Sequence, residues 1–296
     1  MVSSSPNAFR RSLSDRIKRE AKNRRHTHQQ LQRQFLIQRF LARVFANPTG
    51  SWVLKGGTSL LIRLPDARHS RDIDLLHTVD NADKAIAELR TLAGRDAGDP
   101  LTFILGSHRS MTGGVTGVQI PVIAYLGATE FERFTIDLST DLHTVARVER
   151  ARPEPVISIP GLPPLPEFVL YPLPDQVADK VCAMYERHGP RQGPSTRYRD
   201  LVDLLLIITA LPLDAVSTTR SLVSESSRRQ LDLPAALIPP GPEWTTGYRR
   251  VAGDSLVDPA LHDLDSALVR AGACLDPLLS GTLTVGTWNP SRASWR

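Results

Sequence analysis

The 296-residue sequence predicts an α+β protein, with a sheet in its N-terminal part and mainly helices in its C-terminal part. Short apolar runs bounded by glycine, proline or polar residues fall between residues 51 and 138, as is typical of strands. Prolines gather between residues 152 and 174, and the segments beyond them repeat apolar residues with the helical period. We therefore expect two parts, residues 1–150 and 151–296, joined by an extended proline-rich linker.

The first predicted elements alternate between helices and strands. Apolar residues from Leu31 to Phe45 share one broad helical face, which ends near Pro48 and Gly50. The following segments are expected to be, in order, a strand at 51–57 that enters a glycine turn, a helix at 58–64 with Thr58 as N-cap, a loop at 66–70, a strand at 71–77 and a helix at 81–94.

A hairpin and several helices complete the predicted order. Residues 115–138 read as two strands with a turn near Gly127. Beyond the prolines, the helical period covers 175–188, 197–211 and 259–279. We expect a loop at 234–244 and a flexible tail at 280–296.

Positive charge is concentrated at the N-terminus. The whole chain has a net charge of +5, yet residues 1–50 alone hold eleven Lys or Arg and only two acids. A basic helical arm on a mildly acidic body indicates a polyanionic partner, with nucleic acid favoured, although a solvated helix face has the same composition. The arm residues predicted to bind RNA are Arg10, Arg11, Arg16, Lys18, Arg19, Lys22, Arg24 and Arg25.

The remaining composition excludes several classes. No apolar run approaches the roughly 20 residues that a membrane-spanning helix requires, and the N-terminus has no signal-peptide-like apolar stretch. We therefore expect a soluble, cytoplasmic protein with no membrane partner. Cys182 and Cys274 lie in apolar, helix-like sequence, where reduced and buried thiols are the expectation.

Two aspartates separated by one residue, Asp72 and Asp74, are the first candidates for chemistry. On a strand they project from the same face, while Ile73 projects from the other. Crowded carboxylates repel each other, and a hard divalent cation such as Mg²⁺ relieves that repulsion. A D-x-D pair alone is more often a solvated strand edge than a metal site.

A glycine turn before this pair makes the pattern more specific. Gly56 and Gly57 leave a strand and are followed by the hydroxyls of Thr58 and Ser59 at a helix start. Such a turn lets phosphate oxygens approach backbone N–H groups at the positive end of a helix. The alternative is an ordinary tight turn, and the segment lacks the closing lysine of a Walker A loop.

A third acid, Asp137, alternates with apolar residues in a predicted strand. On a strand next to the acid pair it would complete a metal site and deprotonate a hydroxyl nucleophile. An exposed acid at the end of a strand is the alternative.

A lysine and an aspartate lie within apolar helices of the second part. Lys180 and Asp203 are costly to bury unless they are paired, so the simplest interpretation is an ion pair between two helices. The sharper interpretation has Asp203 orient Lys180 toward a triphosphate, whose leaving group an ammonium would neutralise. Asp200 is the next candidate for the orienting role.

Five segments, taken in order, resemble the nucleotidyltransferase-fold toxins of the AbiEii type, which include the mycobacterial MenT toxins. They are LKGGTSLLIR, SRDIDLL, TIDLS, ADKVCAM and RYRDLVDLLL, and they lie between about residues 53 and 208. The resemblance implies a polymerase-beta-type mixed sheet with flanking helices and a mainly helical C-terminal lobe. The link between Lys180 and Asp203 is longer than is usual in the family.

The resemblance also implies roles for residues. Gly56, Gly57, Thr58 and Ser59, together with Lys180, would bind the nucleotide. Asp72, Asp74 and Asp137 would hold two Mg²⁺ or Mn²⁺ ions, and Asp203 is the family's late catalytic aspartate. Ser70 lies where its phosphorylation would block the site.

The implied activity is that of the toxin in a toxin–antitoxin or phage-defence pair. It would transfer nucleotides from an NTP, with CTP favoured, to the 3′ end of tRNA, and a cognate antitoxin would accompany it. Two rival hypotheses remain open. One is a nucleotidyltransferase acting on a small molecule or a protein, and the other is a non-catalytic RNA- or partner-binding module.

Overall fold

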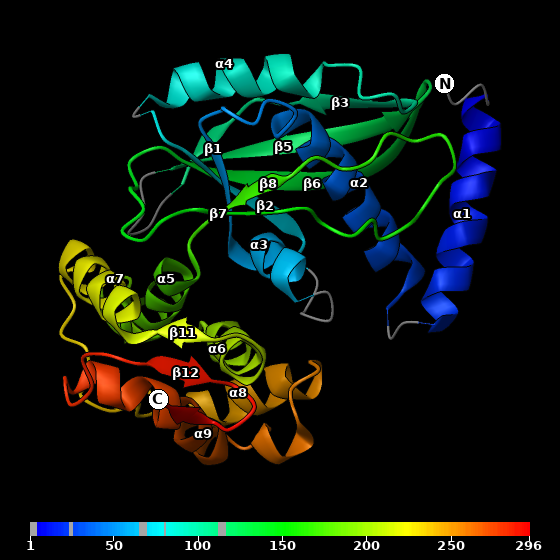
Figure 1. Cartoon of the computed structure of the whole chain (residues 1–296). Helices are drawn as coiled ribbons and strands as arrows, with labels where there is room; N and C mark the ends of the chain where they lie inside the picture. Colours follow the sequence, from blue (N-terminus) through cyan, green and yellow to red (C-terminus); the bar gives the residue numbers. More distant parts are fainter. Residues whose placement is uncertain (1–4, 24–25, 65–69, 80, 112–116) are drawn as a thin grey trace. The chain divides into compact units, whose positions relative to one another are not determined.

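The computed structural model describes residues 5–23, 26–64, 70–79, 81–111 and 117–296 (Figure 1). The chain divides into two compact units. Unit 1 contains Glu149–Leu170 and the described residues of Met1–Arg63 and His69–His143, and unit 2 contains Tyr171–Arg296 with Thr144–Val148 and Leu64. The main division therefore follows Leu170, later than the expected boundary after residue 150.

Unit 1 is built on a mixed sheet. Its strands are β1 (Trp52–Lys55), β2 (Asp72–His77), β3 (Leu101–Leu105), β4 (Arg109–Ser110), β5 (Gly117–Leu126), β6 (Thr129–Ser139), β7 (Glu149–Ala151) and β8 (Phe168–Leu170). Within the described residues the sheet has eight strands in the order β3-β5-β6-β2-β1-β8-β7, with β4 also paired to β5. Strand β2 runs parallel to β6 and antiparallel to β1. The mixed α/β architecture predicted from the sequence is thus confirmed.

Four helices accompany this sheet in the described part of unit 1, namely α1 (Pro6–Asn23), α2 (His28–Val44), α3 (Gly56–Arg63) and α4 (Ala82–Ala93). A capping box starts α2, because Thr27 accepts from the Gln30 backbone N–H and donates its own N–H to the Gln30 side chain. Helix α1 lies beside α2, and α4 lies along β3 (Figure 1).

An aromatic cluster joins α2 to the sheet. The Phe40 ring packs edge-on against Phe103 of β3 at 5.4 Å and against Phe134 of β6 at 5.6 Å between centroids. Edge-to-face pairs of this kind add about 0.5–1.5 kcal/mol beyond the burial of apolar area. The broad apolar face of α2 therefore forms much of the core of unit 1.

A buried charge cluster fixes the same helix to the start of β3. Arg39 and Arg43 donate to the two carboxylate oxygens of Asp99, each at 2.7 Å, and Arg43 also donates to the Leu101 carbonyl at 3.0 Å. Burial alone would raise the pKa of Asp99, but the hydrogen bonds and charges of Arg43 and Arg39 hold that pKa below its ordinary value. The cluster is paired throughout, as buried charges must be.

The proline-rich segment is part of unit 1, so its interpretation as an extended linker is wrong. The Gln38 side chain donates to the Glu154 carbonyl at 2.8 Å and accepts from the Val156 N–H at 2.9 Å. Arg16 donates to the Ser158 carbonyl at 3.0 Å, and the segment then enters β8, which pairs parallel with β1. Its prolines suit an extended strap, because proline has no N–H that would need a partner.

Unit 2 is mainly helical, as expected. Its elements are α5 (Leu173–Tyr185), β9 (Arg187–His188), β10 (Gly193–Pro194), α6 (Tyr198–Ala210), β11 (Leu213–Asp214), α7 (Ala215–Arg229), α8 (Trp244–Gly253), a 3₁₀ turn (Pro259–Leu261), α9 (Leu264–Leu279), β12 (Thr287–Asn289) and β13 (Ser294–Trp295). Helix α5 packs against α6 and α7, and both cysteines are buried. None of the helices in the described ranges is long and apolar enough to span a membrane.

The C-terminal tail is ordered, which corrects the prediction that it is flexible. Strand β12 pairs with β11 and with β13 in a small antiparallel sheet. Trp288 is fully buried, and its indole N–H donates to the Ile208 carbonyl of α6 at 2.7 Å. A large aromatic anchor therefore holds a stretch rich in glycine and polar residues, whose composition resembles that of a loop.

We predict that Trp288→Ala lowers the free energy of unfolding by about 3–5 kcal/mol, because it leaves a cavity and an unpaired carbonyl. Chemical denaturation measures this change. Val285→Ala is the matched control in the same tail, since Val285 is 69% exposed and its loss is expected to cost less than about 0.5 kcal/mol. Equal stabilities of the two variants would contradict the anchoring role.

Candidate active site

The central strands of unit 1 bring three acids onto neighbouring positions of one sheet. In the parallel register of β2 and β6, Asp72 lies opposite Thr135 and Asp74 opposite Asp137. Ile73, between the two acids of β2, is fully buried, whereas Asp72 is exposed and Asp74 half-buried. Alternation along β2 therefore directs both carboxylates away from the face that buries Ile73.

Gly56, the first residue of α3, lies directly against Asp74. Lys55 at the end of β1 pairs with Asp74, and Gly56 follows with a φ of +61°. A Cβ added at Gly56 would stand 1.8 Å from Asp74 Oδ2, well inside any allowed contact. The position therefore requires glycine both for its backbone conformation and for the close approach of the carboxylate.

The hydroxyl groups of Thr58 and Ser59, which follow the glycines, make hydrogen bonds within the protein. Helix α3 begins at Gly56, so the prediction that Thr58 is its N-cap is wrong. Buried Thr58 instead donates to the Asp72 carbonyl at 3.2 Å, and buried Ser59 accepts from Arg63 Nη1 at 2.7 Å. Ser70 also donates to the Asp72 carbonyl, at 2.8 Å. Two hydroxyls thus hold the backbone at the first residue of the acid pair, and Gly57 is buried beside them.

The crowding of these acids affects the pKa of Asp72. Although the residue is exposed, partial desolvation of its carboxyl group first, and then the negative charge of Asp137, raise the pKa of Asp72 above the ordinary value. The positive charges of Arg33 and Arg71 and a hydrogen bond with Thr135 act in the opposite direction but do not cancel the rise. Excess negative charge of this kind favours a bound cation.

Asp137 is held by a residue that sequence reasoning missed. Gln119 of β5 lies opposite it and donates from Nε2 to Asp137 Oδ1 at 3.1 Å. The pairing depends on a register shift between Ala124 and Tyr125, across which Phe131 of β6 has no partner on β5. A two-residue turn after Leu126 without that bulge would set Gln119 opposite Ile136, one residue away.

The residues present suit a divalent cation in their chemistry. Three carboxylates supply the hard oxygen ligands that Mg²⁺ and Mn²⁺ prefer, and their mutual repulsion is what a cation would offset. Over the described ranges, no three or more His, Cys, Asp or Glu side chains are arranged to hold a metal ion as they stand. The structure thus gives the register of the acids and their electrostatic environment.

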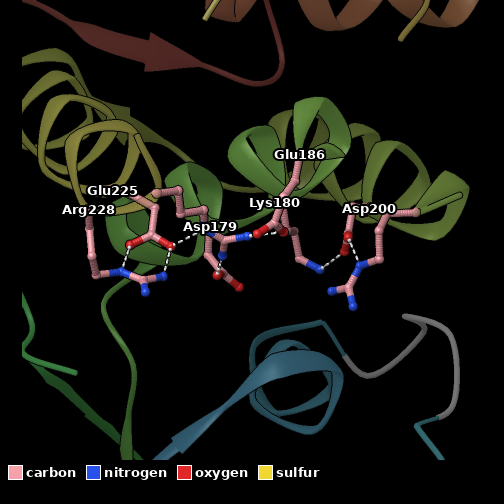
Figure 2. A network of polar contacts seen from close by, with 8 residues as sticks. Asp179, Lys180, Glu186, Asp200, Glu225 and Arg228 are labelled. Carbon is pink, nitrogen blue, oxygen red and sulfur yellow. Dashed lines mark hydrogen bonds and ion pairs between the residues drawn. The ribbon is translucent and has the colours of Figure 1, made fainter. Parts of the chain in front are cut away.

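Unit 2 contains the buried lysine. Lys180 Nζ of α5 donates to Asp203 Oδ2 at 2.6 Å and to Asp200 Oδ1 at 3.0 Å, both on α6 (Figure 2 labels Lys180 and Asp200). Lys180 is 4% exposed, Asp200 3% and Asp203 fully buried. Both acids therefore position the ammonium, where the sequence had left the choice between them open. Arg197 Nε completes the group by donating to Asp200 Oδ2 at 2.7 Å.

A second ion-pair network joins α5 to α7. Arg229 of α7 contacts Asp179 and Glu186, and also Glu225 at 2.7 Å, so it ties α7 to α5. Arg228 adds a forked pair with Glu225 (Figure 2). The network braces the helix that carries Lys180.

The basic arm separates into internal and exposed charges. Arg10 stacks over the Phe131 ring at 5.1 Å, and Arg16 binds the proline-rich strap, so both have structural contacts. The exposed cations of α1 are Arg11, Lys18, Arg19 and Lys22. The predicted RNA-binding residues Arg24 and Arg25 lie outside the described residues.

Comparisons with known proteins support the fold. The chain is similar to MenT4, a nucleotidyltransferase toxin from Mycobacterium tuberculosis H37Rv, with 19% identity and a TM-score of 0.53 over 90% of this chain and 97% of that one. It is also similar to JHP933 from Helicobacter pylori, with 16% identity and a TM-score of 0.47 over 87% of this chain and 94% of that one. No curated protein matches the chain.

A family model gives the assignment. The model described as nucleotidyl transferase AbiEii toxin of a type IV toxin–antitoxin system matches residues 39–270, well over half of the chain. That range contains the glycine turn, the three acids, the lysine and its two partners. The chain therefore belongs to the AbiEii family of nucleotidyltransferase toxins.

Proposed function

We propose that this enzyme transfers a nucleoside monophosphate, with CTP as the favoured donor, to the 3′ end of tRNA and so blocks translation. The observation that carries the proposal is the set of three acids on β2 and β6 with Gly56 against Asp74. Both substrates are cytoplasmic, and we place the reaction there. The family implies a cognate antitoxin that restrains the activity.

In the proposed reaction the 3′-hydroxyl oxygen of the RNA attacks the α-phosphorus. The bond from that phosphorus to the bridging oxygen of the β-phosphate breaks, and pyrophosphate leaves. Asp137, held by Gln119, accepts the hydroxyl proton. The backbone N–H groups at the glycine turn would bind phosphate oxygens, which Gly56 and Gly57 let approach closely.

Asp72, Asp74 and Asp137 would hold the divalent cations, Mg²⁺ or Mn²⁺. Bound there, these ions would polarise the α-phosphate and neutralise charge on the departing pyrophosphate. The raised pKa of Asp72 supports this assignment, because carboxylates that repel one another gain most from a cation.

Lys180 would neutralise negative charge on the triphosphate. Its two carboxylate partners fix the position of the ammonium group on α5. The exposed cations of α1 would bind RNA phosphates without reading sequence. Phosphorylation of Ser70, which touches the Asp72 carbonyl, would place negative charge beside the acids and oppose binding of the donor.

The direct test incubates the protein with total tRNA, Mg²⁺ and each α-labelled NTP separately. We expect one NTP, CTP first, to label the RNA, and Asp72→Asn to abolish labelling because a neutral amide binds the cation poorly. Asp72 is exposed at the start of β2, so the variant should keep its fold by circular dichroism. Equal labelling by a folded Asp72→Asn would refute the metal site, and labelling of a protein or small molecule instead would refute the RNA acceptor.

Gly56→Ala tests the close approach of the turn to Asp74. The added methyl group forces Asp74 aside, so we expect nucleotide transfer to fall sharply. It also strains a left-handed backbone, which should lower the free energy of unfolding by about 1–3 kcal/mol. Gly253→Ala is the control, because a Cβ there meets no atom within 4 Å. Undiminished turnover in Gly56→Ala would show that the carboxylate position is unimportant.

Lys180→Met separates the structural role of the lysine from its catalytic role. Removing one partner of a buried ion pair should lower the free energy of unfolding by about 3–5 kcal/mol, whereas Lys180→Met with Asp203→Leu should recover most of it. Denaturant titration measures both changes, and calorimetry measures NTP affinity. If the stable double variant binds NTP as tightly as the original protein, Lys180 is only a structural ion pair.

A further inference from the structure

The connection between α5 and α6 is a short hairpin with a basic surface. Strands β9 and β10 pair Gly193 with His188 and Pro194 with Arg187, and the turn between them is closed by Gln192 N–H to the Gly189 carbonyl at 3.1 Å. Gly189 and Gln192 both adopt positive φ, so the turn is tight. Arg191 stands at its tip.

Positive charge predominates along this connection. The basic side chains from residue 187 to residue 199 are Arg187, His188, Arg191, Arg197 and Arg199, and the stretch contains no Asp or Glu. Arg197 pairs with Asp200 of α6, whereas Arg187, Arg191 and Arg199 are exposed. Within the described ranges of the chain, no carboxylate pairs with any of these three. Such isolated cations on one short segment repel one another, and an anion with repeated charges would relieve that repulsion.

The base of the hairpin is fixed while its charged part faces solvent. Buried Ser195 follows β10, and its carbonyl accepts from the Trp244 indole N–H at 2.7 Å. Gly241 packs so closely on Pro194 that an added Cβ would stand 2.7 Å from that ring. The arginines are therefore displayed on a braced element, which reduces the entropy lost on binding.

The hairpin is also connected to the buried lysine. Arg197, at the end of the connection, donates to the same Asp200 that accepts from Lys180. The basic segment thus begins and ends on the two helices that hold the ammonium proposed to face the triphosphate.

We propose that the basic hairpin together with the first turn of α6, residues 187–199, binds the phosphate backbone of the RNA acceptor. This inference rests on the proposed function, since it names a second contact for the same substrate. Two exposed guanidinium groups on the hairpin, Arg187 and Arg191, and a third in the first turn of α6, Arg199, could bind phosphates of a nucleic acid, which arginine contacts through its fork of donors.

The test compares two triple variants of the full chain. The hairpin variant carries Arg187→Gln, Arg191→Gln and Arg199→Gln. The control carries Arg220→Gln, Arg250→Gln and Arg292→Gln, which remove the same charge from exposed arginines elsewhere in unit 2. Titration with tRNA at several salt concentrations measures Kd and its salt slope, and steady-state labelling measures KM for the NTP.

We expect the hairpin variant to bind tRNA roughly tenfold more weakly, with a salt slope smaller by about 2 to 3, because each phosphate contact contributes about 0.7–0.9. The control should match the original protein, and KM for the NTP should not change. Equal RNA binding by the two variants would overturn the proposal, as would a raised KM for the NTP with RNA binding unchanged. If the original protein labels no RNA from any NTP yet the hairpin variant loses RNA binding, the proposed reaction fails and the hairpin assignment stands.

Discussion

The register of β2 between β1 and β6 is the constraint on which the candidate site depends. It sets Asp74 opposite both Lys55 and Asp137, and it brings Gly56 against the Asp74 carboxylate. A slip of one residue would turn both acids of β2 into the core and bring Ile73 out. The apolar residues of these strands therefore help to specify the position of the charged ones, because a shift by one residue would expose the apolar side chains.

Buried or crowded charges occur in both units, and in each unit neighbouring residues offset their cost. In unit 2 the burial of Lys180 is compensated by Asp200 and Asp203, with Arg197 balancing the second acid. In unit 1 the nearby arginines offset only part of the desolvation and repulsion at Asp72, so its pKa stays above the ordinary value. The first arrangement is complete as it stands, whereas the second gains from a cationic partner.

The local features of the site could be predicted from the sequence, but its contacts between distant segments could not. The spacing of Asp72 and Asp74 determines that they share a face, whatever the strand pairs with. Gln119 became visible only through the bulge at Phe131, which shifts the hairpin by one residue and has no clear sequence signature. The prediction of a flexible tail was wrong for a related reason. The partner of Trp288 lies on α6, far away in the sequence, and composition does not reveal such a contact.

The same reasoning explains why Thr58 is not the N-cap that the sequence predicts. A hydroxyl at the start of a helix is equally suited to a phosphate, to an N-cap or to a neighbouring backbone carbonyl, because it both donates and accepts. In this fold Thr58 reaches the Asp72 carbonyl, so it fixes the distance between the turn and the acid pair instead of capping α3. Ser70 bonds to the same carbonyl from the other side of the sequence. Hydrogen bonds from two side-chain hydroxyls to one backbone carbonyl thus join the glycine turn to the acid pair.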